Sequence, residues 1–67
     1  MTNTLTEKAQ AFLAQRPTLV GTVLGNRFYE HPRLGDEAPL VVITADGRKR
    51  CSGFYDLPSA AELPNRL

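Results

Sequence analysis

Apolar residues follow two different patterns along this chain. Over Thr4–Arg16, Leu5, Ala9, Phe12 and Leu13 fall on one face at helical spacing. In the remainder of the chain, apolar residues form short runs rich in β-branched and aromatic side chains, a composition typical of strands. The pattern therefore predicts one amphipathic helix followed by several short strands.

The expected helix has a signal at each end. Thr4 and Glu7 match a capping box, in which the Thr hydroxyl accepts a hydrogen bond from the amide three residues later. Pro17 disfavours helical backbone at Arg16 and so ends the element. Because a helix this short is marginal in isolation, Phe12 is expected to pack against the sheet.

The segment Thr18–His31 predicts a first hairpin. Gly25-Asn26 suits a type II′ turn, with Gly at the position that requires positive φ. Phe28 and Tyr29 then lie on opposite faces of the return strand. Phe28 is expected under the helix because it has no hydroxyl to satisfy, and Tyr29 is expected to face outwards. A Gly inside a strand often marks a bulge or a close approach, which we expect at Gly21.

A second predicted hairpin forms the centre of the sheet. Leu40–Ile43 is apolar at every position, which indicates an inner strand covered on both faces. Asp46-Gly47 is a strong turn signal with two compatible registers. A two-residue turn pairs Val42 with Cys51, whereas a type I turn with a Gly bulge pairs Val41 with Cys51. One cover of this strand would be the helix; the other would be the C-terminal segment, the curl of a barrel or a second subunit.

Two segments remain: the connection between the two hairpins and the C-terminal end of the chain. His31–Pro39 is the longest connection, and it is interpreted as a crossover between the hairpins rather than a dedicated binding loop. Ser59–Glu62 matches a second capping box, so a single helical turn through Leu63 is expected before Pro64 ends it.

The predicted fold is a single α+β domain over residues 1–67, with the N-terminal helix packed on an antiparallel meander of about four strands. A curled SH3-like barrel is the alternative. The expected core consists of Leu5, Ala9, Phe12, Leu13, Val20, Val23, Phe28, Val41, Ile43 and Phe54.

Composition narrows the class of protein. With 67 residues, three Phe, two Tyr and no Trp, the core is thin, and self-association would add buried surface. One Cys excludes an internal disulfide, and a net charge of +1 argues against a dedicated nucleic-acid binder. The chain has neither an apolar run of membrane-spanning length nor a signal peptide's apolar core, so a cytoplasmic protein without membrane contact is expected.

Candidate chemistry is sparse. His31, Asp36 and Glu37 share one loop without a spacing that would fix metal ligands, so no metal or cofactor is expected. Cys51 has basic neighbours that would lower a thiol pKa, but a buried apolar role is favoured because free Cys is among the most buried residue types. No other arrangement indicates catalysis or a small-molecule substrate, so an enzyme is not expected.

The leading functional hypothesis is a small non-catalytic interaction module that binds a protein partner, or a second copy of itself, through its sheet. The predicted partner-binding residues are Tyr29, His31, Arg33 and Tyr55.

The alternative hypothesis is weak binding of single-stranded nucleic acid. Arg48, Lys49 and Arg50 at the second hairpin would contact phosphates, and Tyr55 would stack on a base. A solvated turn that keeps the hairpin soluble is the favoured interpretation of this basic triplet.

Overall fold

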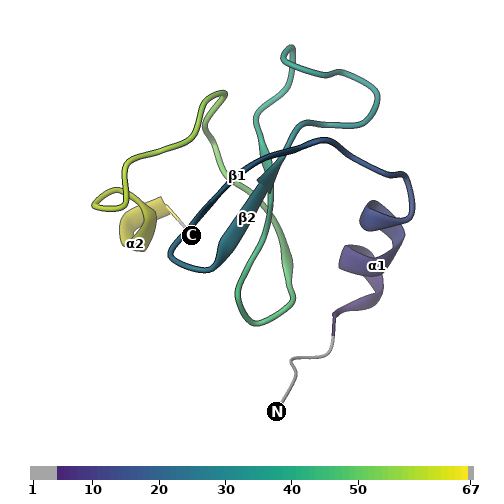
Figure 1. Cartoon of the computed structure of the whole chain (residues 1–67), viewed down its shortest axis with the longest axis horizontal. Coiled ribbons are helices and arrows are strands. Elements are labelled where there is room, and N and C mark those ends of the chain that lie inside the picture. Colours follow the sequence, from purple (N-terminus) through teal and green to yellow (C-terminus); the bar gives the residue numbers. More distant parts are fainter. Residues whose placement is uncertain (1–4, 67) are drawn as a thin grey trace.

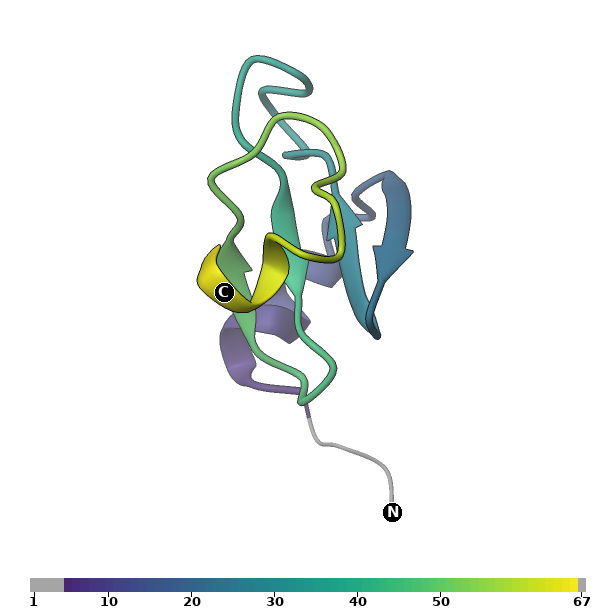
Figure 2. The same ribbon diagram turned by 90° about the vertical axis from the view of Figure 1, so that its left-hand side faces the viewer.

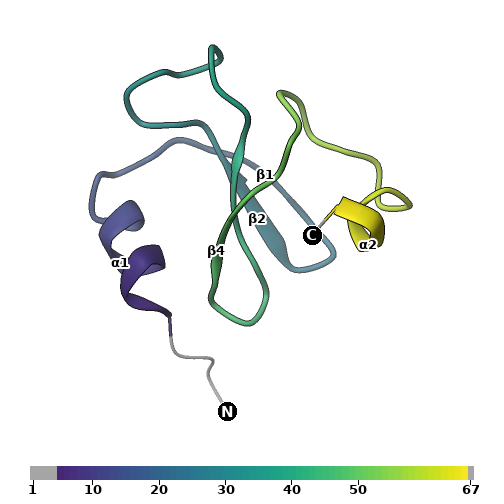
Figure 3. The same ribbon diagram turned by 180° about the vertical axis from the view of Figure 1, so that it is seen from behind.

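The structure is a computed structural model that describes residues 5–66. Four strands form one antiparallel sheet in the order β1-β2-β3-β4, and the two helices lie on opposite sides of it (Figure 1; Figure 3 gives the view from behind). The predicted small antiparallel sheet of four strands is confirmed. The elements are α1 (Glu7–Leu13), β1 (Leu19–Val23), β2 (Asn26–Tyr29), β3 (Val41–Ile43), β4 (Lys49–Cys51) and α2 (Leu63–Arg66).

The N-terminus of α1 is capped by Thr6. Its Oγ1 accepts a hydrogen bond from the Ala9 amide at 3.2 Å, and its own amide donates to the Gly47 carbonyl at 3.0 Å. The predicted cap, Thr4, lies outside the described residues. Glu7 is the first helical residue and not the third, so the predicted capping box is wrong and the helix begins later than expected.

The C-terminus of α1 is also earlier than predicted. The helix ends at Leu13, and the Gln15 and Arg16 amides donate to carbonyls only three residues back. Arg16 then adopts a φ of 56°, which is outside the right-handed helical region that Pro17 disfavours but is left-handed rather than the extended backbone usual before a proline.

The β1–β2 hairpin turns one residue earlier than predicted. Val23 pairs with Asn26, so Leu24 and Gly25 form the turn, with φ values of 52° and 83°. Two successive positive φ values define a type I′ turn and not the predicted type II′ turn. A type I′ turn matches the right-handed twist of the strands, as a type II′ turn also does, but here it places Leu24 at a positive φ that Leu fits poorly.

Replacing Leu24 with Asn should therefore stabilise the protein. Leu at φ 52° is strained, whereas Asn tolerates this conformation and Asn-Gly is the preferred type I′ pair. We expect the melting temperature to rise by several degrees, for a gain of about 1 kcal/mol in a domain of this size. Circular dichroism melting measures it. Leu24→Val is the matched opposite, because a β-branched residue tolerates positive φ least, and an equal response of both variants would contradict the prediction.

Gly21 meets both expectations for it. The β1–β2 ladder shifts between Leu19 and Gly21, which leaves Val20 as a bulge. A Cβ built on Gly21 would lie 2.5 Å from Leu57 Cδ1. Glycine thus allows the segment after β4 to lie against β1.

The β3–β4 hairpin adopts the bulged register. Val41 pairs with Cys51, and Gly47 has the positive φ of 89° that a glycine bulge requires. The Gly47 amide donates to the Thr44 carbonyl at 2.9 Å, and the Thr44 amide donates to the Arg48 carbonyl at 2.8 Å. The type I turn with a bulge is confirmed, and the two-residue register is wrong.

The segment His31–Pro39 does not cross the sheet, which corrects the sequence interpretation. It joins β2 to β3, which are neighbours in the sheet. The segment folds on itself, since the Gly35 amide donates to the His31 carbonyl at 2.9 Å and the Glu37 amide donates to the Leu34 carbonyl at 3.0 Å.

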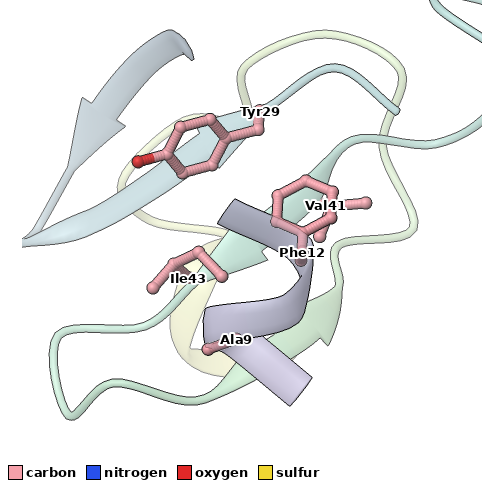
Figure 4. Packing of buried hydrophobic residues seen from close by; sticks show 5 residues of the cluster. All are labelled: Ala9, Phe12, Tyr29, Val41 and Ile43. Carbon is pink, nitrogen blue, oxygen red and sulfur yellow. The ribbon is translucent and has the colours of Figure 1, made fainter. Parts of the chain in front are cut away.

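One hydrophobic cluster joins α1 to the sheet. It consists of Ala9, Phe12, Tyr29, Val41 and Ile43, and the rings of Phe12 and Tyr29 meet edge to face with centroids 5.7 Å apart (Figure 4). The aromatic residue under α1 is therefore Tyr29, so the prediction of Phe28 there is wrong. Tyr29 can occupy this place because its hydroxyl points away from the cluster (Figure 4).

A second cluster lies on the other face of the sheet. Phe28, Leu40 and Val42 pack with Leu63 of α2, which is only 2% exposed. Figure 2 shows α2 close to the strands on this side. The C-terminal segment thus covers the second face of β3, one of the three covers considered.

The C-terminal helix occupies a different place from the predicted one. It begins at Leu63, where the predicted turn ends, and Pro64 lies inside its first turn. Proline is tolerated there because the first helical amides have no partner within a helix. The prediction that Pro64 ends the turn is therefore wrong.

The expected core is mostly right. Ala9, Phe12, Phe28, Val41 and Ile43 are buried, but Val20 is 40% exposed and Phe54 is only half-buried. Within residues 5–66, no helix is long and apolar enough to span a bilayer.

Candidate functional site

The three basic residues of the β3–β4 hairpin do not form one patch. Arg48 Nε lies 3.5 Å from Asp46 Oδ2 at the turn. Lys49 Nζ lies 5.8 Å from the centroid of the Phe12 ring, on the α1 face. Arg50 pairs with Val42 of β3 and therefore shares the opposite face. The structure disperses these charges in three directions.

The turn between β3 and β4 shifts the pKa of Asp46. A hydrogen bond from the Thr44 hydroxyl lowers the pKa of its carboxyl below 3.8, and the nearby Arg48 charge adds to this effect. Thr44 Oγ1 also accepts from the Arg48 amide at 3.1 Å. The polar contacts of this turn therefore maintain the bulged register rather than a site for a ligand.

Acid should weaken this turn. Because folding lowers the pKa of Asp46, the ionised carboxylate stabilises the fold above pH 3.8, and this contribution is lost as the pH falls through the lowered value. Thr44→Val should raise the Asp46 pKa towards 3.8, because it removes the largest cause of the shift. An NMR titration of the carboxyl carbon between about pH 2 and 6 measures both effects. Arg48→Gln is the control with a smaller expected rise, and an unchanged pKa in Thr44→Val would contradict the assignment.

The four predicted partner-binding residues lie in three different environments. Tyr29 is 7% exposed, so its predicted outward placement is wrong. Tyr55 is 56% exposed. His31 and Arg33 lie together in the β2–β3 connection, where His31 Nδ1 accepts hydrogen bonds from the Arg33 and Leu34 amides at 3.2 and 3.3 Å. The structure therefore brings together only His31 and Arg33.

A pocket of about 270 Å³ lies between α1 and the turn at His31-Pro32. Lys8, Ala11 and Phe12 of α1 form one wall together with Gln15, which follows the helix, and residues of β3 and β4 also line the pocket. A second pocket of similar size, which includes Arg33, continues from it and shares its Gln15, His31 and Pro32 lining. Sequence reasoning missed this site, because Lys8 and Gln15 fall on the polar side of the predicted helix.

Cys51 is exposed, which corrects the prediction that it is buried. Its register position opposite Val41 was foreseen as one alternative, but β4 is an edge strand and all three of its residues are exposed. Nor does any group of three or more metal-ligating side chains gather within residues 5–66.

The two edges of the sheet differ in charge. β4 carries Lys49 and Arg50 at one edge, whereas β1 has no charged residue. Leu19 and Val20 of β1 are 50% and 40% exposed. Thr22 turns its backbone N–H and C=O away from β2, because a two-residue hairpin bonds the pairs on either side of it. The β1 edge is therefore uncharged, partly apolar and open for backbone pairing at Thr22.

No protein-family model matches the chain, and neither the curated proteins nor the solved structures searched give a match.

Proposed function

We propose that this chain is a small non-catalytic interaction module that pairs through the β1 edge of its sheet, with a second copy as the partner. The observation that carries the proposal is the contrast between the two edges. Proteins commonly protect an edge strand with charge, as Lys49 and Arg50 do on β4. β1 lacks this protection and exposes Leu19 and Val20 instead.

A second copy fits this edge because antiparallel pairing of β1 with itself is self-complementary. A two-fold axis near Thr22 would join the outward backbone groups of both protomers, as an isologous interface requires. The exposed side chains of Leu19 and Val20 would then be covered by the partner strand. The bulge at Val20 limits the paired length, so the complex would be weak.

The expected affinity of the dimer follows from the surface area that a short strand pair can bury. A stable interface buries about 800 Å² on each partner, which is a large share of the 4654 Å² surface of this chain. A short strand pair covers less than this, so we expect a dissociation constant of about 10–100 µM.

Sedimentation equilibrium between about 10 µM and 1 mM tests the proposal. The wild type should show a rising average mass, and Val20→Lys should remain monomeric, because the lysine would place a charge where the partner strand is to cover an apolar side chain. Thr22→Pro should do the same, since it removes an outward N–H without breaking the β1–β2 ladder. The matched control is Leu34→Lys, at a residue that is 50% exposed and far from β1 in the sequence. A wild type that stays monomeric at 1 mM, or equal effects of Val20→Lys and Leu34→Lys, would overturn the proposal.

The proposal also covers how α1 packs on the sheet and in which cellular compartment the protein works. The shared cluster of Ala9 and Phe12 with Tyr29, Val41 and Ile43 supports an α+β arrangement in which α1 covers one face of the sheet. The free, exposed thiol of Cys51 supports a reducing, cytoplasmic environment.

Weak binding of single-stranded nucleic acid remains the second candidate, and the exposure of Lys49 and Arg50 favours it. Their placement on opposite faces would let only one of them reach a given strand at a time. An oligonucleotide titration at low salt tests it: a salt slope of about −0.7 for each phosphate contact would support the candidate, and the absence of any shift at these residues would end it.

A further inference from the structure

The pocket beside α1 combines an apolar floor with a cationic rim. Phe12 and Val41 are 4% and 7% exposed and form part of its lining together with Ala11 and Pro32. Lys8 and Lys49 are exposed residues of the same lining, and no Asp or Glu belongs to it. The pocket therefore has positive potential above an apolar surface.

The two lysines at the rim of the pocket come from different elements of the fold. Lys8 lies one turn before Phe12 on α1, and Lys49 reaches over the Phe12 ring from β4, with Nζ 5.8 Å from the ring centroid. The Coulomb attraction of two such groups for one anion adds up, since neither is neutralised by an ion pair within the described residues.

The third polar group is His31, whose role is set by its backbone contacts. Nδ1 accepts hydrogen bonds from the Arg33 and Leu34 amides, so in the neutral ring the proton resides on Nε2. The ring is held in place by the turn that it caps and offers only a donor to the pocket. Gln15 also lines the pocket, and its side-chain amide is a further donor.

From this arrangement we propose that the pocket binds a small organic anion with an apolar body, such as an arylcarboxylate or an aryl phosphate. The apolar body would lie against Phe12 and Val41, and the anionic group would lie between Lys8 and Lys49. The volume of about 270 Å³ lies just below the usual range for ligand pockets and suits one ring with its charged group, not a macromolecule. This site is separate from the β1 edge and does not depend on the proposed pairing.

The neighbouring pocket is a poorer site for an anion with an apolar body. It contains Arg16 and Arg33, but Glu30 also lines it, so its charge is partly compensated. Its lining is more polar and lacks an aromatic residue. An apolar anion would therefore prefer the pocket at Phe12.

Titration of the ¹⁵N-labelled protein with phenylacetate tests the proposal. The amides of Lys8, Phe12, His31 and Lys49 should shift together and saturate, with a dissociation constant on the order of 1 mM, as for a ligand of this size on an open site. Benzyl alcohol has the ring without the charge and acetate has the charge without the ring, so both should bind at least about fivefold more weakly. Comparing phenyl phosphate with phenylacetate shows whether the pocket prefers a phosphate or a carboxylate.

Substitutions separate binding of phenylacetate in the pocket from a general attraction of anions to the protein surface. Lys8→Gln with Lys49→Gln should weaken phenylacetate about tenfold, whereas Arg50→Gln, on the same strand but the opposite face, should change binding less than twofold. Ala11→Leu should also abolish binding, because it keeps both charges and the helix but fills the pocket. Equal shifts with benzyl alcohol, shifts scattered over the surface, or equal effects of the Lys and Arg50 variants would overturn the proposal.

Discussion

Replacing Leu63 with Ala should remove most of the stability of this protein. Leu63 is 2% exposed and is the residue through which α2 covers Phe28, Leu40 and Val42. Truncating a buried Leu to Ala costs about 2–5 kcal/mol. A chain of 67 residues has a free energy of unfolding of roughly 3–10 kcal/mol, so this loss is comparable to the whole.

Urea denaturation followed by circular dichroism measures the loss. Leu63→Val is the graded variant, expected to lose about 1 kcal/mol and to remain folded where Leu63→Ala does not. The control is Leu34→Ala, at a Leu that is 50% exposed, with an expected change within about 0.5 kcal/mol. Equal changes in Leu63→Ala and Leu34→Ala would show that α2 does not cover this face.

Hydrogen exchange adds a local readout. The Leu40 amide donates to the Phe54 carbonyl and the Ser52 amide donates to the Leu40 carbonyl, which attaches the segment after β4 to the start of β3. Loss of the Leu63 contact should speed exchange at these amides more than at Gly47, which lies at the far turn.

The pattern of strands could be predicted from the sequence because turn residues and apolar runs are local. Asp46-Gly47 and the two-faced Leu40–Ile43 run placed the central hairpin, and the bulged register was one of only two alternatives. In the register that the chain adopts, the Thr44 side chain bonds to Asp46 and to the Arg48 amide. A side-chain contact across a turn is not visible in a turn propensity.

The faces of the sheet were harder to assign. A shift of one residue exchanges the two faces of a strand, and the first hairpin turns at Leu24-Gly25 instead of Gly25-Asn26. The turn signal at Gly25 was correct, but the strain accepted at Leu24 was not predictable from propensity. Which of Phe28 and Tyr29 lies under α1 is decided by tertiary packing.

The candidate sites depend still more on tertiary structure. The β1 edge became distinct only once the strand order placed β4 at the opposite edge and the apolar β3 inside. The pocket at Phe12 joins residues of α1, β3, β4 and the β2–β3 connection. No spacing in the sequence relates Lys8 to Lys49, whereas His31 was identified because it is the sole His in the longest loop.

Tyr29 provides the sharpest test of the corrected face assignment. Its ring lies edge to face with Phe12 and belongs to the cluster with Ala9, Val41 and Ile43. Tyr29→Ala should cost about 3–5 kcal/mol, as for other buried aromatic residues, and thus leave the chain largely unfolded. Tyr29→Phe should change the free energy of unfolding by less than about 1 kcal/mol, because the hydroxyl points away from the cluster (Figure 4).

Tyr55→Ala is the matched control, since the second Tyr is 56% exposed and its truncation should cost less than about 0.5 kcal/mol. Urea denaturation of the four proteins, wild type included, gives all three differences in one experiment. If Tyr29→Ala and Tyr55→Ala were equally stable, Tyr29 would be a surface residue and α1 would pack elsewhere. The expected inequality has a consequence for function: binding lost in Tyr29→Ala would reflect unfolding, whereas binding lost in Tyr55→Ala would identify a contact.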